Sequence, residues 1–200
     1  DLIFFLTFLI PIFITIILNS TLYDGWRHLY FIYPSFLMVS IYGLNLIKTV
    51  ILKKKNLIIN FLTCFLVLQI FIWMYLNHPF QNVYFNLLAE KNFNKNFEMD
   101  YWGISNKIAL EYIIKKTNKK VNVYNLNTSD LALSKQILRK KDRDLINVTY
   151  ELAKTNYIIN SFRDWNGAIK PQDYLVPSNF EILHEIKVDD VVINTVYKKK

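Results

Sequence analysis

The chain has 200 residues, of which 52% are hydrophobic and 16% aromatic, and its net charge is +8. This composition excludes a disordered chain, and the scattered lysines lack the basic face with stacking aromatics that nucleic-acid binding needs, so no nucleic acid is expected as a partner. The one cysteine, Cys64, excludes an internal disulfide and a cysteine-based metal cluster.

Apolar residues are unevenly distributed along the chain. Residues 1–76 hold nearly all the long apolar runs, whereas residues 77–200 have the composition of an ordinary soluble domain. The sequence therefore predicts a multi-pass α-helical membrane part with three transmembrane helices at 1–76, followed by a small extracytoplasmic α/β domain at 77–200.

The three predicted membrane helices cover residues 2–18, 34–52 and 57–76. The first run is long enough for about 26 Å of helix at ~1.5 Å per residue. It has no basic region before it and no small-residue cleavage site, so it resembles a membrane helix more than a signal peptide. We expect it to belong to a chain whose beginning is missing.

The predicted outer loop at 19–33 places Asp24, Arg27 and His28 among several aromatic residues, between two apolar runs. Charges this close to hydrocarbon are costly unless they lie at the interface, pair, or face a wet cavity. The loop is either a functional site or an interfacial anchor, in which Trp26 and the tyrosines form an aromatic belt and Arg27 reaches the head groups. Both readings stay open on spacing alone.

A triple lysine, Lys53-Lys54-Lys55, lies in the short connection between the second and third predicted helices. Short basic loops stay in the cytoplasm. We therefore expect residues 53–56 inside, and residues 19–33 and 77–200 outside, in a protein of the cytoplasmic membrane.

The remaining residues alternate between helical and strand patterns. Ile104, Ile108 and Tyr112 fall on one helix face. The predicted elements are a helix at 104–116 starting near Gly103 or Ser105, a strand at 121–126, a helix at 129–138, a solvated face or loop at 139–143, a short strand at 157–160, and a hairpin of strands 180–188 and 191–197.

Few residues are suited to a metal or a cofactor. Asp24 and His28 have the i, i+4 spacing of two ligands on a helix, but two ligands do not make a site. The sequence predicts no cofactor and no metal site, and leaves a divalent ion open. His78, which follows the third apolar run, is either a site residue or a turn residue beside Pro79.

Three stretches together carry a resemblance: Tyr23-Asp-Gly-Trp-Arg-His28 followed by Pro34, His78-Pro-Phe-Gln-Asn-Val-Tyr-Phe-Asn86, and Phe97-Glu-Met-Asp-Tyr-Trp-Gly103. Their order and spacing resemble the late extracytoplasmic region of glycosyltransferases with the GT-C fold. More narrowly, they resemble bacterial relatives of the dolichyl-phosphate-mannose–protein mannosyltransferases and of the lipid A aminoarabinose transferase. The resemblance covers residues 22–103.

The resemblance implies a transferase that moves a sugar from a polyprenyl-phosphate carrier to a lipid, glycan or protein acceptor outside the cytoplasmic membrane. It implies that Arg27 and His28 face the donor phosphate, with Asp24, Tyr23 and His78 in support. Arg offers a fixed, always-charged fork that suits phosphate.

The catalytic acid of such enzymes lies in their first extracytoplasmic loop, so no residue of 1–200 is given that role and the chain is expected to be inactive alone. The alternative is a non-enzymatic membrane-anchored protein whose outer domain binds a partner. In that case Asp24, Arg27 and His28 only anchor the loop.

Overall fold

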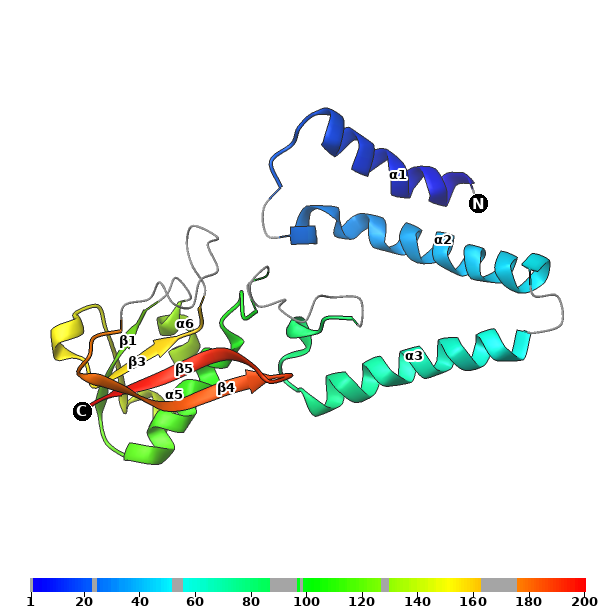
Figure 1. Cartoon of the computed structure of the whole chain (residues 1–200). Helices are drawn as coiled ribbons and strands as arrows, with labels where there is room; N and C mark the ends of the chain where they lie inside the picture. The colour runs from blue at the N-terminus through cyan, green and yellow to red at the C-terminus, as the bar shows by residue number, and fades with distance from the viewer. Residues whose placement is uncertain are drawn as a thin grey trace. The chain divides into compact units, whose positions relative to one another are not determined.

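The computed structural model describes residues 2–22, 25–51, 56–86, 97, 99–126, 130–162 and 176–200. The chain forms two compact units, Asp1–Gln69 and Ile70–Lys200 (Figure 1). The division falls inside a long helix, so the end of that helix belongs to the second unit.

The first unit is helical. Its elements are α1 (Leu2–Ile17), the 3₁₀-helix η1 (Gly25–Ile32), α2 (Tyr33–Leu46), the π-helical turn η2 (Ile47–Ile51), and the first part of α3 (Asn56–Leu76). The α1 and α2 helices touch through the Thr7 and Ser35 hydroxyls, 2.8 Å apart, and through the rings of Phe8 and Phe36, whose centroids are 5.4 Å apart.

In the part of the chain that the structure describes, two helices are long and apolar enough to cross a membrane. They are Arg27–Val50, with 24 residues, and Leu57–Leu76, with 20 residues. Only 6% and 0% of their apolar windows are buried, whereas the core helix of a soluble protein is mostly buried. These two helices support association with a membrane.

The prediction of three membrane-crossing helices is therefore wrong. The helix predicted at 2–18 is α1, which has 16 residues and ends at Ile17. Asn19 takes a left-handed conformation with φ 47°, and the Ser20 N–H donates to the Thr15 carbonyl at 3.0 Å, closing the helix end. Sixteen residues span only about 24 Å, less than the ~30 Å hydrocarbon core of a bilayer.

The segment predicted as an outer loop at 19–33 contains the helix η1 over residues 25–32. This helix runs directly into α2, where Pro34 occupies the first turn. Proline suits that position because its fixed φ is helical and its missing N–H has no partner there. The apolar helical span thus begins at Arg27 rather than near residue 34.

The second unit contains a five-stranded mixed sheet. Its strands are β1 (Val121–Asn125), β2 (Ile146–Thr149), β3 (Tyr157–Asn160), β4 (Phe180–Val188) and β5 (Val191–Lys199). They lie in the order β2-β1-β3-β5-β4. The first three are parallel, and β5 is antiparallel to both β3 and β4.

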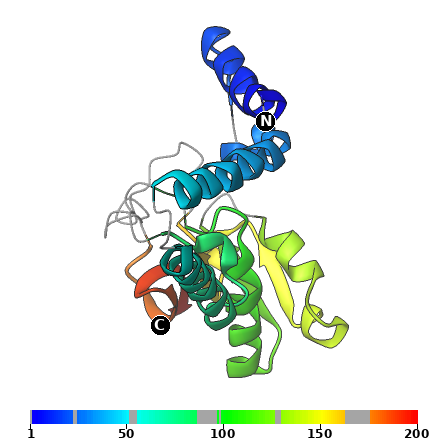
Figure 2. The same cartoon turned by 90° about the vertical axis from the view of Figure 1, so that its right-hand side faces the viewer.

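Helix α5 (Ile104–Thr117) covers one face of this sheet (Figure 2). The core beneath it contains Val123, Ile159 and Val196 from β1, β3 and β5, all 0% exposed. Two short helices, α6 (Leu131–Gln136) and α7 (Lys140–Arg143), connect β1 to β2. The Asp130 carboxylate caps α6 by accepting from the Ala132 N–H at 2.8 Å.

The last residues of α3 pack into the second unit. Trp73 lies against its core, and the indole Nε1–H donates to Asp189 Oδ2 at 2.8 Å, in the turn between β4 and β5. The Trp73 and Tyr84 rings meet edge to face, with centroids 4.9 Å apart. Phe80 and Val83, just after α3, are buried in the same core.

Several elements predicted for this unit agree with the structure. The predicted helix at 104–116 is α5, the strands at 121–126 and 157–160 are β1 and β3, and the hairpin is β4 and β5. The stretch 139–143, predicted as a solvated face or a loop, contains the helix α7, which has no buried residues. Strand β2 was not predicted.

Candidate functional site

The candidate site is built on η1, which holds eight residues in 3₁₀ geometry. A 3₁₀-helix has three residues per turn, so residues three apart lie in one column along its axis, and runs this long are uncommon. Leu29 and Ile32 form the inward column, and Ile32 is 2% exposed. The other two columns, which carry Arg27 and His28, therefore face outward.

Each basic side chain has an aromatic ring one turn further along. Tyr30 follows Arg27 and is 69% exposed, and Phe31 follows His28 and is 66% exposed. Arg27 and His28 are both exposed. The side chains of consecutive residues on a 3₁₀-helix point about 120° apart, so Arg27 and His28 border adjacent sectors of the helix surface.

An apolar cleft of about 430 Å³ lies beside these residues, between α1, η1 and the start of α2. It is lined by Phe8, Leu29, Tyr30, Ile32, Tyr33 and Phe36. The cleft adjoins the column of Arg27, because Tyr30 belongs to that column and also lines the cleft. A hydrocarbon chain fits such a lining, and a phosphate attached to that chain would meet a permanent guanidinium charge.

The other predicted site residues lie elsewhere. Tyr23 and Asp24 are outside the described residues. His78 belongs to the second unit, where its Nδ1 accepts from Gln81 Nε2 at 2.7 Å, and Gln81 also donates to the Met74 carbonyl at 3.2 Å. These bonds close the turn after α3, which is the turn role weighed for His78.

Within the described ranges, no group of three or more His, Cys, Asp or Glu side chains is gathered as a metal would need. The pair Asp24 and His28 is not tested, because Asp24 lies outside them.

A polar cluster missed by the sequence analysis lies at the start of α5. The Asp100 carboxylate accepts from the Ile104 and Ser105 backbone N–H groups, both at 2.9 Å, and from the Ser105 hydroxyl. Asn194 on β5 donates to Ser105 Oγ at 2.7 Å and to Asn106 Oδ1 at 3.0 Å. Burial raises the pKa of the Asp100 carboxyl, and the bonds from Ser105 and Ile104 oppose that rise.

This cluster cannot reach a substrate, since Asp100 is 1% exposed and the other three residues are 0% exposed. Its role is to cap α5 and to tie the helix start to β5. An aspartate shortly before a predicted helix is the signal that could have indicated the cap. The partner on β5 is 89 residues away from Ser105, and no local pattern indicates it.

The parallel strands create a second polar edge. Sheets of this order bind ligands outside the carboxyl ends of the strands, where the strand order reverses, which here lies between β1 and β3. Asn125 ends β1 and Asn160 ends β3. Asn160 is 1% exposed, and its Oδ1 accepts from the Phe162 N–H at 2.9 Å. The side chains at these two strand ends are neutral amides, without the cationic group of η1.

In comparisons with known proteins, no protein-family model, no curated protein and no solved structure matches this chain. The resemblance seen over residues 22–103 therefore stays a prediction.

Proposed function

We propose that this chain is a portion of an integral-membrane glycosyltransferase that takes a sugar from a polyprenyl-phosphate donor. The observation that carries the proposal is the pairing of exposed Arg27 with an apolar aromatic cleft, at the start of a helix long enough to cross a membrane. A lipid phosphate combines the same two properties, a long apolar chain and a fixed negative charge.

In the proposed reaction, Arg27 binds the donor phosphate through charge-assisted hydrogen bonds. As the sugar leaves, negative charge grows on that phosphate, and a donor already in place stabilises it. His28 is a second donor beside the phosphate. Asp24 and Tyr23, which shortly precede Arg27 in the sequence, are the proposed supporting residues. No residue of this chain is proposed as the catalytic acid.

The proposed location is the cytoplasmic membrane, with the second unit outside. The lysines at 53–55 lie between the two helices that are long enough to cross. Short basic connections stay in the cytoplasm. In the proposed orientation η1 lies on the outer side, where a translocated lipid-linked sugar would present its phosphate.

The test measures binding of a polyprenyl monophosphate to the full chain in phosphatidylcholine nanodiscs. Arg27→Ala should weaken binding about tenfold or more, because a charged hydrogen-bond donor is lost. Arg27→Lys should restore part of the affinity, since it keeps the charge and loses the fork. Lys107→Ala, which removes an exposed cation from α5, is the control and should bind normally. In membranes with transfer activity, Arg27→Ala should lower the rate about a hundredfold per folded molecule.

A second candidate function is a non-enzymatic membrane anchor with an outer partner-binding domain. The exposed rings of Tyr30 and Phe31 favour it, because aromatic side chains gather at membrane interfaces. On this reading Arg27→Ala leaves polyprenyl-phosphate binding unchanged and lowers only membrane insertion. Unchanged binding in a correctly inserted variant would end the glycosyltransferase proposal.

A further inference from the structure

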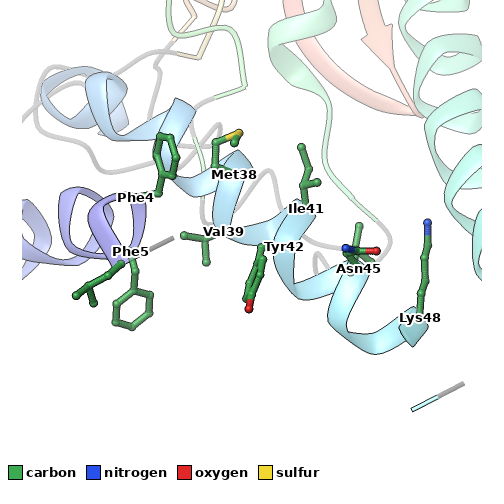
Figure 3. A pocket seen from close by; sticks show the side chains of 10 residues that line it. Phe4, Phe5, Met38, Val39, Ile41, Tyr42, Asn45 and Lys48 are labelled. Carbon is green, nitrogen blue, oxygen red and sulfur yellow. The ribbon is translucent and has the colours of Figure 1, made fainter. Parts of the chain in front are cut away.

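A pocket in the first unit lies between α1 and α2, away from η1. It has a volume of about 650 Å³. Phe4 and Phe5 line it from α1 (Figure 3). From the other side it is lined by Met38, Val39, Ile41, Tyr42, Leu44 and Asn45 of α2 and by Lys48 of η2. Most of this lining is apolar, so the groove suits a hydrocarbon chain.

One end of the groove is polar. Asn45 and Lys48 lie at the end of α2 that is farther from Phe4 and Phe5 (Figure 3). Lys48 is part of η2, where α2 widens into a π-helical turn. Such turns are rare in proteins, and many of those that occur lie at functional sites. The half-exposed Lys48 ammonium is therefore positioned where an apolar chain in the groove would end in a charged group.

The surrounding sequence supplies positive charge without an acid to neutralise it. Four lysines lie between positions 48 and 55, and residues 25–89 contain no Asp or Glu. Clusters of this size beside a membrane helix attract anionic lipid head groups, at about 1 kcal/mol for each basic residue near the surface.

The groove is distinct from the η1 site. Arg27 and Lys48 lie at opposite ends of one helical span, separated by roughly 30 Å at about 1.5 Å per residue, which is the thickness of a hydrocarbon core. A single head group cannot reach both.

We propose that the groove between α1 and α2 binds an anionic phospholipid of the cytoplasmic leaflet. One acyl chain lies along Phe5, Met38 and Leu44, and the phosphate binds the Lys48 ammonium. This lipid is neither donor nor acceptor of the proposed reaction, and the inference does not depend on that reaction.

The test is native mass spectrometry of the full chain, released from nanodiscs that hold equal parts of phosphatidylglycerol and phosphatidylcholine. The expected result is retained phosphatidylglycerol. Lys48→Gln should reduce its preference over phosphatidylcholine about fivefold, and Lys48→Arg should keep it. Leu44→Trp fills the groove and should abolish retention. Leu46→Trp is the matched control, since Leu46 is exposed on the same helix and does not line the groove.

Several outcomes would overturn the proposal. Equal retention of phosphatidylglycerol and phosphatidylcholine would show that the groove does not select a lipid by the charge of its head group. Equal effects of Leu44→Trp and Leu46→Trp would place the lipid outside the groove. Loss of retention on replacing Lys53, Lys54 and Lys55 by Gln, with no effect of Lys48→Gln, would place the head group on that connection. Detection of a protein dimer without bound lipid would show that the groove is an interface between two copies of the chain. Circular dichroism confirms that each variant is helical, and Met38→Trp replaces Leu44→Trp if the latter does not insert.

Discussion

Asp100 makes the stability of the second unit depend on pH. Its carboxyl is buried and its pKa is raised, despite the hydrogen bonds from Ser105 and Ile104. The folded state therefore holds a proton at pH values where the unfolded chain has lost it. The free energy of unfolding should then fall as pH rises from about 4 through the raised pKa, because the unfolded state binds fewer protons.

Asp100→Asn should remove this slope, since the amide does not titrate and its oxygen still accepts a hydrogen bond at the helix start. The measurement is hydrogen exchange of the β-strand amides in the full chain between pH 4 and pH 8, corrected for intrinsic exchange. The stability of the wild-type chain relative to Asp100→Asn should decrease with pH. An increase would mean that the hydrogen bonds outweigh burial and depress the pKa.

The hairpin of β4 and β5 is joined to α3 by the bond between Trp73 and Asp189. Asp189 and Asp190 both have positive φ, 47° and 65°, so alanine is similarly strained at either position. Asp189→Ala also loses the acceptor for the Trp73 indole. It should cost about 1 kcal/mol more than Asp190→Ala, measured by hydrogen exchange in the hairpin.

The double-mutant cycle with Trp73→Phe makes the test specific, because Phe keeps a ring beside Tyr84 and removes the N–H donor. If the bond stabilises the unit, Asp189→Ala should lower the free energy of unfolding less in the Trp73→Phe background than in the wild-type chain. The loss that remains is the cost of the strained turn. Equal costs of Asp189→Ala and Asp190→Ala in the wild-type background would show that the bond is not stabilising.

Local patterns predicted some elements well and others not at all. Helix α5 was predictable because Ile104, Ile108 and Tyr112 recur at helical spacing, and the β4–β5 hairpin because Asp189-Asp190 separates two apolar runs. Strand β2 has four residues, INVT, too few for a clear alternation. Helix η1 was missed because its period of three matches neither the helix nor the strand pattern, and its mixed aromatic and charged residues resemble a loop.

The candidate site also has features that the sequence predicted and features that it did not. The sequence indicated Arg27 and His28, because charged residues beside apolar runs are noticeable without a structure. It did not indicate the aromatic cleft, which requires Phe8 from α1 to meet Tyr30 and Phe36. It also did not indicate the groove at Lys48, which depends on the approach of α1 to α2. Contacts between distant residues decide both features.

For the molecule as a whole, the predicted topology can be tested by labelling. In a Cys64→Ala background, Ser20→Cys should react with an impermeant thiol reagent in intact cells, because the segment before the apolar span that begins at Arg27 is expected outside. Asn56→Cys should react only after the cells are permeabilised, since it adjoins the triple lysine. The reverse labelling pattern would invert the orientation and place the second unit in the cytoplasm.

The position of β5 in the sheet also affects how the second unit is made. This strand, Val191–Lys199, is the last of the five in sequence, yet it lies inside the sheet and joins β3 to β4. Until a ribosome has synthesised residue 199, β3 has a bare edge and β4 has no neighbour in the sheet. The emerging chain must therefore stay partly unfolded through synthesis of nearly the whole unit, and over that interval its unpaired strand edges are open to chaperones, proteases and wrong partners.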